Sequence, residues 1–198
     1  LENPTQKPTI QIALLLDTSN SMDGLIDQAK SQLWKMVNEL ATTKKKGQSP
    51  YIEIALYEYG NSGLDQAGNY IRQVSELSAD LDLVSERLFS LSTNGGDEYC
   101  GAVITDATLN LKWSDDKGDL KLIFIAGNEP FTQGPIDFRA ACKDAISQGI
   151  QINTIFCGSF DEGVNTNWKE GADLADGKYL NINQDEEVVH IATPYDQD

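Results

Sequence analysis

The chain has 198 residues, of which 40% are hydrophobic and 23% are charged, and this composition is typical of one globular domain with a full hydrophobic core. Its formal net charge of −16 at pH 7 argues against nucleic acid or an anionic membrane as a partner, because both are bound by clustered lysines and arginines. No apolar run approaches the roughly 20 residues of a membrane-spanning helix, so we expect no membrane insertion. Cations and basic surfaces are the partners that this charge favours.

Residues 1–8 contain two prolines and several polar residues, which indicates a linker or N-terminal arm ahead of a single domain at 9–198. The domain begins with an apolar run from Ile10 to Leu16 that only Gln11 interrupts. The run lacks the alternation of a strand with one solvated face, and this is typical of a strand buried on both faces. We expect it to be the central strand of an α/β sheet.

Strand and helix patterns alternate along the rest of the chain. Short apolar or alternating runs bounded by turn residues predict strands at 51–59, 70–74, 120–126, 150–156 and 178–182. Apolar residues at three- and four-residue steps predict helices at 24–43, 80–91, 100–113, 135–148, 164–175 and 185–191. This order, with no internal repeat, predicts an α/β fold with one doubly wound sheet between two layers of helices.

Polar side chains follow the first strand directly. Asp17, Ser19 and Ser21 lie on the turn between that strand and the helix at 24–43. Open α/β sheets bind ligands at the carboxyl ends of their strands, and one carboxylate with two hydroxyls is a set of hard oxygen ligands suited to Mg²⁺ or Mn²⁺. The alternative is that these side chains only cap the next helix. We favour a cation site, because all three follow the strand at two-residue steps with no apolar residue between them.

The segment ALLLDTSNSMDG (residues 13–24), together with the amphipathic helix after it, resembles the start of a von Willebrand factor type A (VWA) domain. In that family the D-x-S-x-S signature opens the metal-ion-dependent adhesion site (MIDAS). The resemblance extends over most of the chain and implies a Rossmann-like, mostly parallel sheet of about six strands with helices on both faces. It also implies one antiparallel edge strand, which we assign to 70–74.

The segment NGGDEYCGA (residues 94–102) is similar to the second MIDAS loop of those VWA branches that carry a Glu after Gly-Gly-Asp. By that match Glu98 is the favoured second-loop ligand and Asp97 follows it. Thr93 is the alternative if its hydroxyl points inward. The alternative without a cation is that Gly95 and Gly96 form a turn and Asp97 caps the next helix.

The third motif departs from the family pattern. VWA domains usually carry an aspartate just after the fourth strand, whereas Gly127 stands at the matching position, in the segment Ile125-Ala126-Gly127-Asn128. Glu129, two residues further on, is the remaining candidate, either as a direct ligand or through a water. The departure weakens the expected cation site and leaves the expected fold unchanged.

The resemblance implies a protein-binding module for adhesion or assembly, in which a cation engages an acidic residue of a protein partner. The cation is expected to be Mg²⁺, or else Mn²⁺ or Ca²⁺, and the candidate ligands are Asp17, Ser19, Ser21, Glu98, Asp97 and Glu129. The alternatives are a metal-free VWA scaffold with a vestigial site and, less favoured, a metal-dependent hydrolase. The chain also resembles VWA domains of uncharacterised exported bacterial proteins, so we expect a periplasmic or extracellular location, and a monomer.

Catalytic motifs are absent from the sequence. It contains no G-x-S-x-G elbow, no G-x-x-x-x-G-K-[ST] phosphate loop and no G-x-G-x-x-G after the first strand, so we expect no enzyme. A phosphoryl-transfer aspartate at Asp17 is the best enzymatic alternative, but phosphatases of the haloacid dehalogenase type need a second carboxylate where this chain has Ser19. The lone histidine, His190, lies far along the sequence and is more typical of a surface or packing residue.

The three cysteines, Cys100, Cys142 and Cys157, form no C-x-x-C pattern, and their odd number leaves at least one unpaired within the monomer. Cys100 and Cys142 lie on the apolar stripes of two predicted helices. We therefore favour buried thiols over a disulfide.

Overall fold

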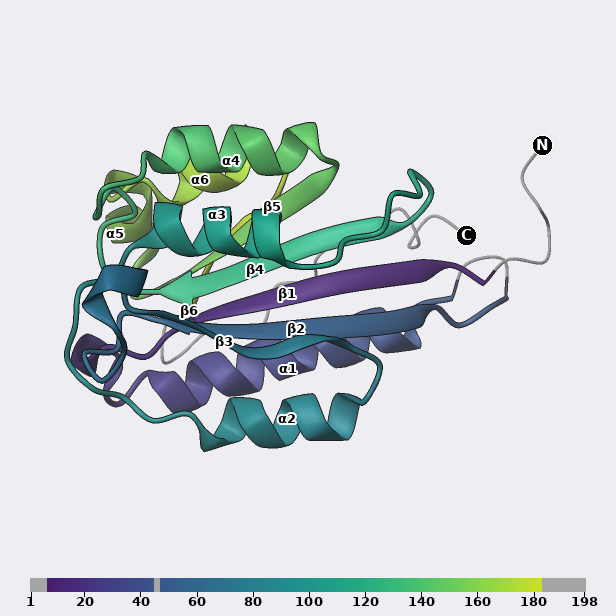
Figure 1. Cartoon of the computed structure of the whole chain (residues 1–198), viewed down its shortest axis with the longest axis horizontal. Coiled ribbons are helices and arrows are strands. Elements are labelled where there is room, and N and C mark those ends of the chain that lie inside the picture. The colour runs from purple at the N-terminus through teal and green to yellow at the C-terminus, as the bar shows by residue number, and fades with distance from the viewer. Residues whose placement is uncertain (1–6, 45–46, 183–198) are drawn as a thin grey trace.

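The computed structural model describes residues 7–44 and 47–182. Residues 1–6 of the predicted N-terminal arm lie outside this range, as does the predicted helix at 185–191 with His190. The described residues form one sheet with helices on both faces (Figure 1). This is the α/β architecture that the sequence predicts.

Within the described residues, six strands form one sheet in the order β3-β2-β1-β4-β5-β6. Their bounds are β1 (Thr9–Asp17), β2 (Tyr51–Tyr59), β3 (Ile71–Ser78), β4 (Leu120–Gly127), β5 (Ile150–Cys157) and β6 (Tyr179–Ile182). β3 runs antiparallel to β2 at one edge, and the other neighbouring strands are parallel. The mostly parallel sheet with one antiparallel edge strand is therefore confirmed.

Helices cover both faces of the sheet (Figure 1). α1 (Ile26–Thr42) and α2 (Leu81–Ser90) pack on one face, and α3 (Cys100–Asn110), α4 (Phe138–Ser147) and α6 (Trp168–Leu174) pack on the other. α5 (Phe160–Asn165) follows β5, and two 3₁₀ turns, η1 (Asn20–Met22) and η2 (Gln66–Gly68), follow β1 and β2. Both layers leave the carboxyl ends of the parallel strands accessible to loops.

β1 has neighbours on all sides, and this explains its unbroken apolar run. Ile10 and Leu14 belong to the core on the α1 side, whereas Ala13 and Leu15 belong to the core on the α3 side. All four side chains are fully buried. Because both faces of this strand are covered, apolar residues are needed at successive positions rather than at alternate ones.

The predicted helix at 164–175 is two helices in the structure. α5 ends at Asn165 and α6 begins at Trp168, and between them Asn167 adopts a left-handed conformation with a φ of 73°. The Trp168 side chain is fully buried, and its Nε1 donates a hydrogen bond to the Glu129 carbonyl at 2.7 Å. The break therefore directs a large side chain into the core, which the apolar pattern alone does not reveal.

β3 is longer than the predicted strand at 70–74. Its pairing with β2 continues to Ser78 through two irregularities in register beside Leu56. A strand at the edge of a sheet tolerates such irregularities, because one side of it has no partner strand to match.

All three cysteines are free and buried, as predicted for Cys100 and Cys142. Burial raises the pKa of the Cys142 thiol to about 12. The reactive thiolate form is therefore scarce at neutral pH, and these thiols act as small apolar core residues.

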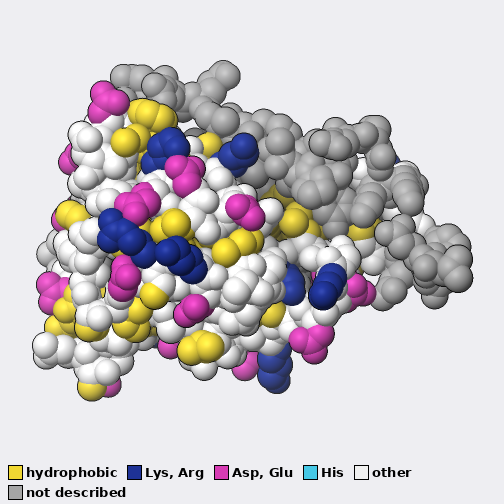
Figure 2. Space-filling model, turned by 90° about the horizontal axis from the view of Figure 1, so that it is seen from above, with side chains coloured by type: hydrophobic (Ala, Val, Ile, Leu, Met, Phe, Trp, Pro, Cys, Tyr) yellow, Lys and Arg dark blue, Asp and Glu magenta, His cyan; other side chains and the backbone are white. Residues whose placement is uncertain are grey.

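Acidic and basic side chains are interspersed on the face over α3 and α4 (Figure 2). Arg139 pairs with Glu170 and Lys169 pairs with Asp173, each with a nitrogen–oxygen distance of 2.6 Å. Lysines and arginines that are paired in this way do not form the positive patch that phosphate groups require. Among the described residues, no helix has the length and apolarity needed to cross a membrane.

Candidate functional site

Asp17 is the last residue of β1, at the edge of the sheet where the parallel strands end (left in Figure 1). Its side chain is fully buried. Its Oδ1 accepts a hydrogen bond from the Ser19 N–H at 2.8 Å, whereas its Oδ2 is buried without a partner among the described residues. A buried carboxylate oxygen without a donor is energetically costly, so Oδ2 is the first sign of a binding site.

The two serine hydroxyls extend from Asp17 toward solvent. Ser19 is buried and Ser21 is exposed, and their Oγ atoms lie 2.9 Å apart. The Ser21 hydroxyl donates to Asn128 Oδ1 at 2.8 Å, and Asn128 Nδ2 donates to the Ser21 carbonyl at 3.0 Å. These two bonds join the loop after β1 to the loop after β4.

Capping does not explain these side chains. Ser19 is the N-cap of η1 and Leu25 is the N-cap of α1, and neither makes a side-chain capping bond. Asp17 bonds to the Ser19 N–H outside any helix. The capping alternative for the D-x-S-x-S segment is therefore not what the structure shows.

Glu98 enters the same crevice from the segment between α2 and α3. Its side chain is buried, with 7% of the residue exposed. A Cβ atom at Gly60 would lie 2.8 Å from Glu98 Cγ and 3.1 Å from Asp17 Oδ1, so both carboxylates flank this glycine. Gly96 packs so closely on the same turn that a Cβ there would lie 2.3 Å from the Gly60 carbonyl oxygen. Two glycines thus let the Glu98 segment approach Asp17.

We call Asp17, Ser19, Ser21 and Glu98 the oxygen cluster. Burial is the main cause that raises the pKa of Asp17 to about 6 and that of Glu98 to about 7. The negative charge of Asp17 raises the pKa of Glu98 further, and hydrogen bonding from the Ser19 side chain partly opposes both shifts. Both carboxylates are therefore hard to ionise together unless a positive charge lies between them.

Gly127, where the family pattern has an aspartate, has no space for a side chain. A Cβ atom there would lie 2.6 Å from the Tyr59 hydroxyl oxygen, 3.0 Å from a ring carbon of Trp168 and 3.1 Å from Asp17 Cβ. Tyr59 is held in this position because its hydroxyl donates to the Ala126 carbonyl at 3.0 Å and accepts from the Cys100 thiol at 3.8 Å. The position of the missing aspartate is thus occupied by the packed side chains of Tyr59 and Trp168, which we call the aromatic floor of the site.

The remaining candidates lie around the cluster without joining it. The Thr93 hydroxyl donates to Asp23 rather than pointing inward. Asp97 is exposed and accepts from the Tyr99 hydroxyl at 3.4 Å, and it does not cap α3, whose N-cap is Tyr99. The charge of Glu129 raises the pKa of both Asp17 and Glu98, so this residue lies near the cluster. Metal ligation by any of these residues stays a prediction.

Sequence reasoning missed Asn128, Tyr59 and Gly60. The bond between Ser21 and Asn128 spans 107 positions in the sequence, so no local spacing could reveal it. Gly60 opens a Gly- and Asn-rich connection and has a φ of 79°, which a glycine adopts easily. A glycine directly after a strand was the only signal available for this part of the site.

The oxygen cluster fits a hard divalent cation. Its donors are two carboxylates and two hydroxyls, which suit Mg²⁺, Mn²⁺ or Ca²⁺ rather than a thiolate- or imidazole-preferring metal. Among the described residues, no group of three or more His, Cys, Asp and Glu side chains is arranged to hold a metal. A cation here would therefore depend on the serine hydroxyls and on water, and Asp17 Oδ2 is the atom that it would satisfy.

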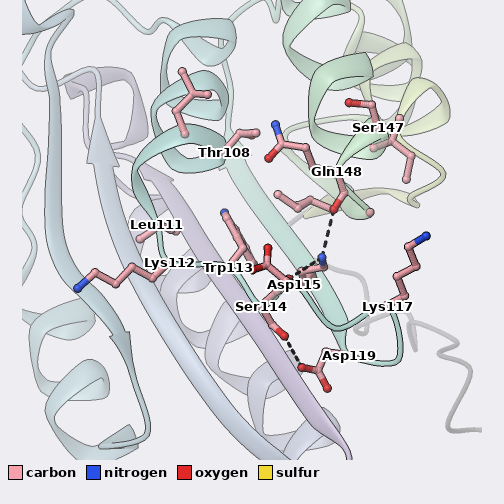
Figure 3. A pocket seen from close by; sticks show the side chains of 15 residues that line it. Thr108, Leu111, Lys112, Trp113, Ser114, Asp115, Lys117, Asp119, Ser147 and Gln148 are labelled. Carbon is pink, nitrogen blue, oxygen red and sulfur yellow. Dashed lines mark hydrogen bonds between the residues drawn. The ribbon is translucent and has the colours of Figure 1, made fainter.

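A cavity of about 650 Å³ lies at the opposite end of the sheet, between the ends of α3 and α4 (Figure 3). Lys121 Nζ is already bonded there, since it donates to the Ser114 carbonyl at 2.9 Å and to the Gln148 carbonyl at 3.2 Å. Lys112 and Lys117 point away from each other (Figure 3). The lysines that line the cavity therefore do not converge on one point, and we place the candidate functional site at the oxygen cluster.

The sheet order, the two helix layers and the oxygen cluster at the strand ends define an open α/β domain with a candidate ligand site at its carboxyl edge. The chain has the fold of VWA domains. It matches the VWA domain of SpRpn10 with a TM-score of 0.67 at 16% identity, over 91% of each chain. It matches the conserved hypothetical protein BatB from Bacteroides thetaiotaomicron with a TM-score of 0.66 at 16% identity, over 88% of this chain and 90% of that one.

A further match is proximal thread matrix protein 1 from the mussel byssus, in a structure described as having a zinc-occupied MIDAS motif. The TM-score is 0.63 at 11% identity, and the match covers 91% of this chain and 43% of the mussel protein. No protein-family model and no curated protein matches the sequence. At these identities the likeness is one of fold, so the function must be argued from the site.

The first prediction concerns the aromatic floor. Gly127→Ala should lower the free energy of unfolding by about 1–3 kcal/mol, because the new methyl group overlaps Tyr59 and Trp168. Gly68→Ala is the matched control, since the nearest atom to its Cβ would be 3.9 Å away. Urea unfolding of both variants gives the comparison. Equal stability of the two variants would show that the floor is loosely packed.

The second prediction concerns pH and the metal-free protein in EDTA. The pKa values of about 6 for Asp17 and about 7 for Glu98 exceed the ordinary values of 3.8 and 4.5. Between about pH 4 and 7 the folded state therefore binds more protons than the unfolded chain, and stability should fall as the pH rises through this window.

The test is the melting temperature at pH 5 and pH 8 for the wild type and for Asp17→Asn combined with Glu98→Gln. The double variant should lose much of the fall, because neither replacement titrates. Asp115→Asn combined with Glu86→Gln, two exposed positions, is the control. If wild type and the first double variant show the same fall, the two buried carboxylates do not control the stability profile.

Proposed function

We propose that this chain is a protein-interaction module that holds a divalent cation at the oxygen cluster and uses it to engage a carboxylate of a protein partner. The observation that carries the proposal is the environment of Asp17. Its Oδ2 is buried without a partner, and the Glu98 carboxylate shares the crevice. A divalent cation would satisfy the oxygen and neutralise both charges at once.

The residues of the cluster have distinct parts in this proposal. Asp17 and Glu98 would supply the charged ligands, and Ser19 and Ser21 the neutral ones. The Ser19 N–H donates a hydrogen bond to Asp17 Oδ1, and Oδ2, which has no partner among the described residues, would face the cation. Bound in this way, the cation would supply a positive centre with room for an outside oxygen ligand.

The direction of access follows from burial. Asp17 and Ser19 are buried, whereas Ser21 is exposed. A partner would therefore reach the cluster from the Ser21 side. A carboxylate is the matching group, because it is the common anionic oxygen ligand of proteins.

A periplasmic or extracellular location and a monomeric state stay predictions.

A metal-free scaffold is the second candidate, and one observation favours it. Tyr59 and Trp168 fill the position where the family pattern has an aspartate, so the site lacks one of the expected carboxylates. Protons could then neutralise Asp17 and Glu98 in place of a cation, as their raised pKa values allow. We propose no catalytic activity in either case, since Ser19 stands where a phosphatase of the haloacid dehalogenase type needs a carboxylate.

The third prediction separates these two candidates. Excess Mg²⁺ or Mn²⁺ should raise the melting temperature relative to EDTA, because a ligand that binds only the folded state stabilises it. At a concentration of about 100 Kd the gain is about 2.7 kcal/mol. Ser19→Ala combined with Ser21→Ala should abolish the shift, whereas Ser147→Ala, beside the cavity at the opposite end of the sheet, should keep it. Identical melting of the wild type in metal and in EDTA would favour the metal-free scaffold.

The fourth prediction concerns the partner group. On an array of short peptides, binding in Mg²⁺ should be confined to peptides that contain Asp or Glu, and it should disappear in EDTA. The matched array replaces every Asp by Asn and every Glu by Gln, which preserves shape and removes charge. Equal binding to both arrays would show that the contact does not depend on a carboxylate, even if the metal binds.

A further inference from the structure

Asn128 lies directly after β4, in the segment that we call the third loop, and its side chain contacts the oxygen cluster. Its side-chain amide makes two hydrogen bonds to one residue, accepting from the Ser21 hydroxyl at 2.8 Å and donating to the Ser21 carbonyl at 3.0 Å. Both ends of the amide are therefore used, and its orientation is fixed by the loop that it holds.

We infer that Asn128 is a positioning residue, which orients the Ser21 hydroxyl so that its oxygen lone pairs face the cation. This inference rests on the proposed function. It assigns to the third loop a neutral clamp in place of the charged ligand for which Gly127 leaves no space.

The direction of the Ser21 hydroxyl proton decides whether the Ser21 oxygen can bind a cation. A serine hydroxyl has one proton and two lone pairs, so it can ligate a cation only if the proton is directed elsewhere. Asn128 Oδ1 accepts the hydrogen bond from the Ser21 hydroxyl, so the Ser21 proton points toward the third loop. With its own proton directed to Asn128, the Ser21 oxygen accepts the hydrogen bond from the Ser19 hydroxyl at 2.9 Å with one lone pair and keeps the other for the cation. Without this acceptor, the Ser21 proton could turn toward the cation and repel it.

An aspartate could not perform the same task at position 128. A carboxylate would accept the Ser21 proton, but it could not donate to the Ser21 carbonyl, which lies 3.0 Å from Asn128 Nδ2. It would also bring another negative charge toward Asp17, whose own charge is already unfavourable in its buried position. The amide supplies a donor and an acceptor without adding charge.

The test measures the Mn²⁺ dissociation constant of four proteins by electron paramagnetic resonance of free Mn²⁺. They are wild type, Asn128→Ala, Ser21→Ala and the double variant. Asn128→Ala should weaken binding by about 10- to 100-fold, the usual effect of removing a group that orients a metal ligand. The double variant should bind about as weakly as Ser21→Ala alone, because Asn128 acts through Ser21. A purely structural role would not give this lack of additivity.

Two controls guard the result. Asn181→Ala removes an amide that donates to the Gly158 carbonyl at 3.2 Å, away from the cluster, and it should bind Mn²⁺ as the wild type does. Asn128→Leu keeps the number and branching of the side-chain heavy atoms and removes both hydrogen bonds, so it should weaken binding as Asn128→Ala does. The metal-free melting temperature of each variant shows whether it is folded.

Three outcomes would contradict the inference, and they differ from one another. If wild type binds Mn²⁺ and folded Asn128→Ala and Asn128→Leu bind within about twofold of it, Asn128 has no positioning role. If the losses of Asn128→Ala and Ser21→Ala multiply in the double variant, Asn128 acts by a route other than Ser21. If wild type binds no Mn²⁺ at all, the proposed function itself is wrong, and the role of Asn128 with it.

Discussion

One carboxylate oxygen of Asp17 accepts a hydrogen bond from the Ser19 N–H at 2.8 Å, and the other oxygen is buried without a partner among the described residues. This arrangement is unfavourable for a charged group, and the neighbouring Glu98 carboxylate adds like-charge repulsion. Either a proton or a cation can relieve it. Among the described residues, the loops at the end of β1 supply hydroxyls and close-packed glycines, and no Lys or Arg forms an ion pair with Asp17 or Glu98.

The floor under the carboxylates limits how much charge the site can carry. Tyr59 is anchored to the Ala126 carbonyl and to Cys100, and together with Trp168 it fills the space above Gly127. Each of these side chains is fixed by core packing rather than by a ligand. A third carboxylate at position 127 would require Tyr59 and Trp168 to repack. The acids at or near the site are therefore Asp17 at the end of β1, Glu98 between α2 and α3, and Glu129 after β4.

The sequence was most informative where local pattern and buried position coincide. The apolar run before Asp17 predicted the central strand, and the D-x-S-x-S segment and the Glu98 position predicted residues that the fold brings together, whereas Asp97 stays exposed outside the cluster. What it could not show depends on contacts between distant segments. Asn128 meets Ser21 across 107 positions, and Gly60 lies under Glu98 only because β2 ends beside β1. The break at Asn167 likewise depends on where Trp168 must pack.

Charge balance determines what kind of partner the proposed site can hold. Asp17 and Glu98 together would neutralise the two charges of a divalent cation. A partner's carboxylate would therefore meet a site with little excess positive charge. Direct coordination of the cation would have to supply most of the attraction. At longer range the net charge of −16 repels an acidic partner, although salt screens this field beyond about 8 Å. A carboxylate set in a basic surface avoids that repulsion. The proposed function therefore implies a partner that presents an isolated acid among lysines or arginines, rather than a broadly acidic protein.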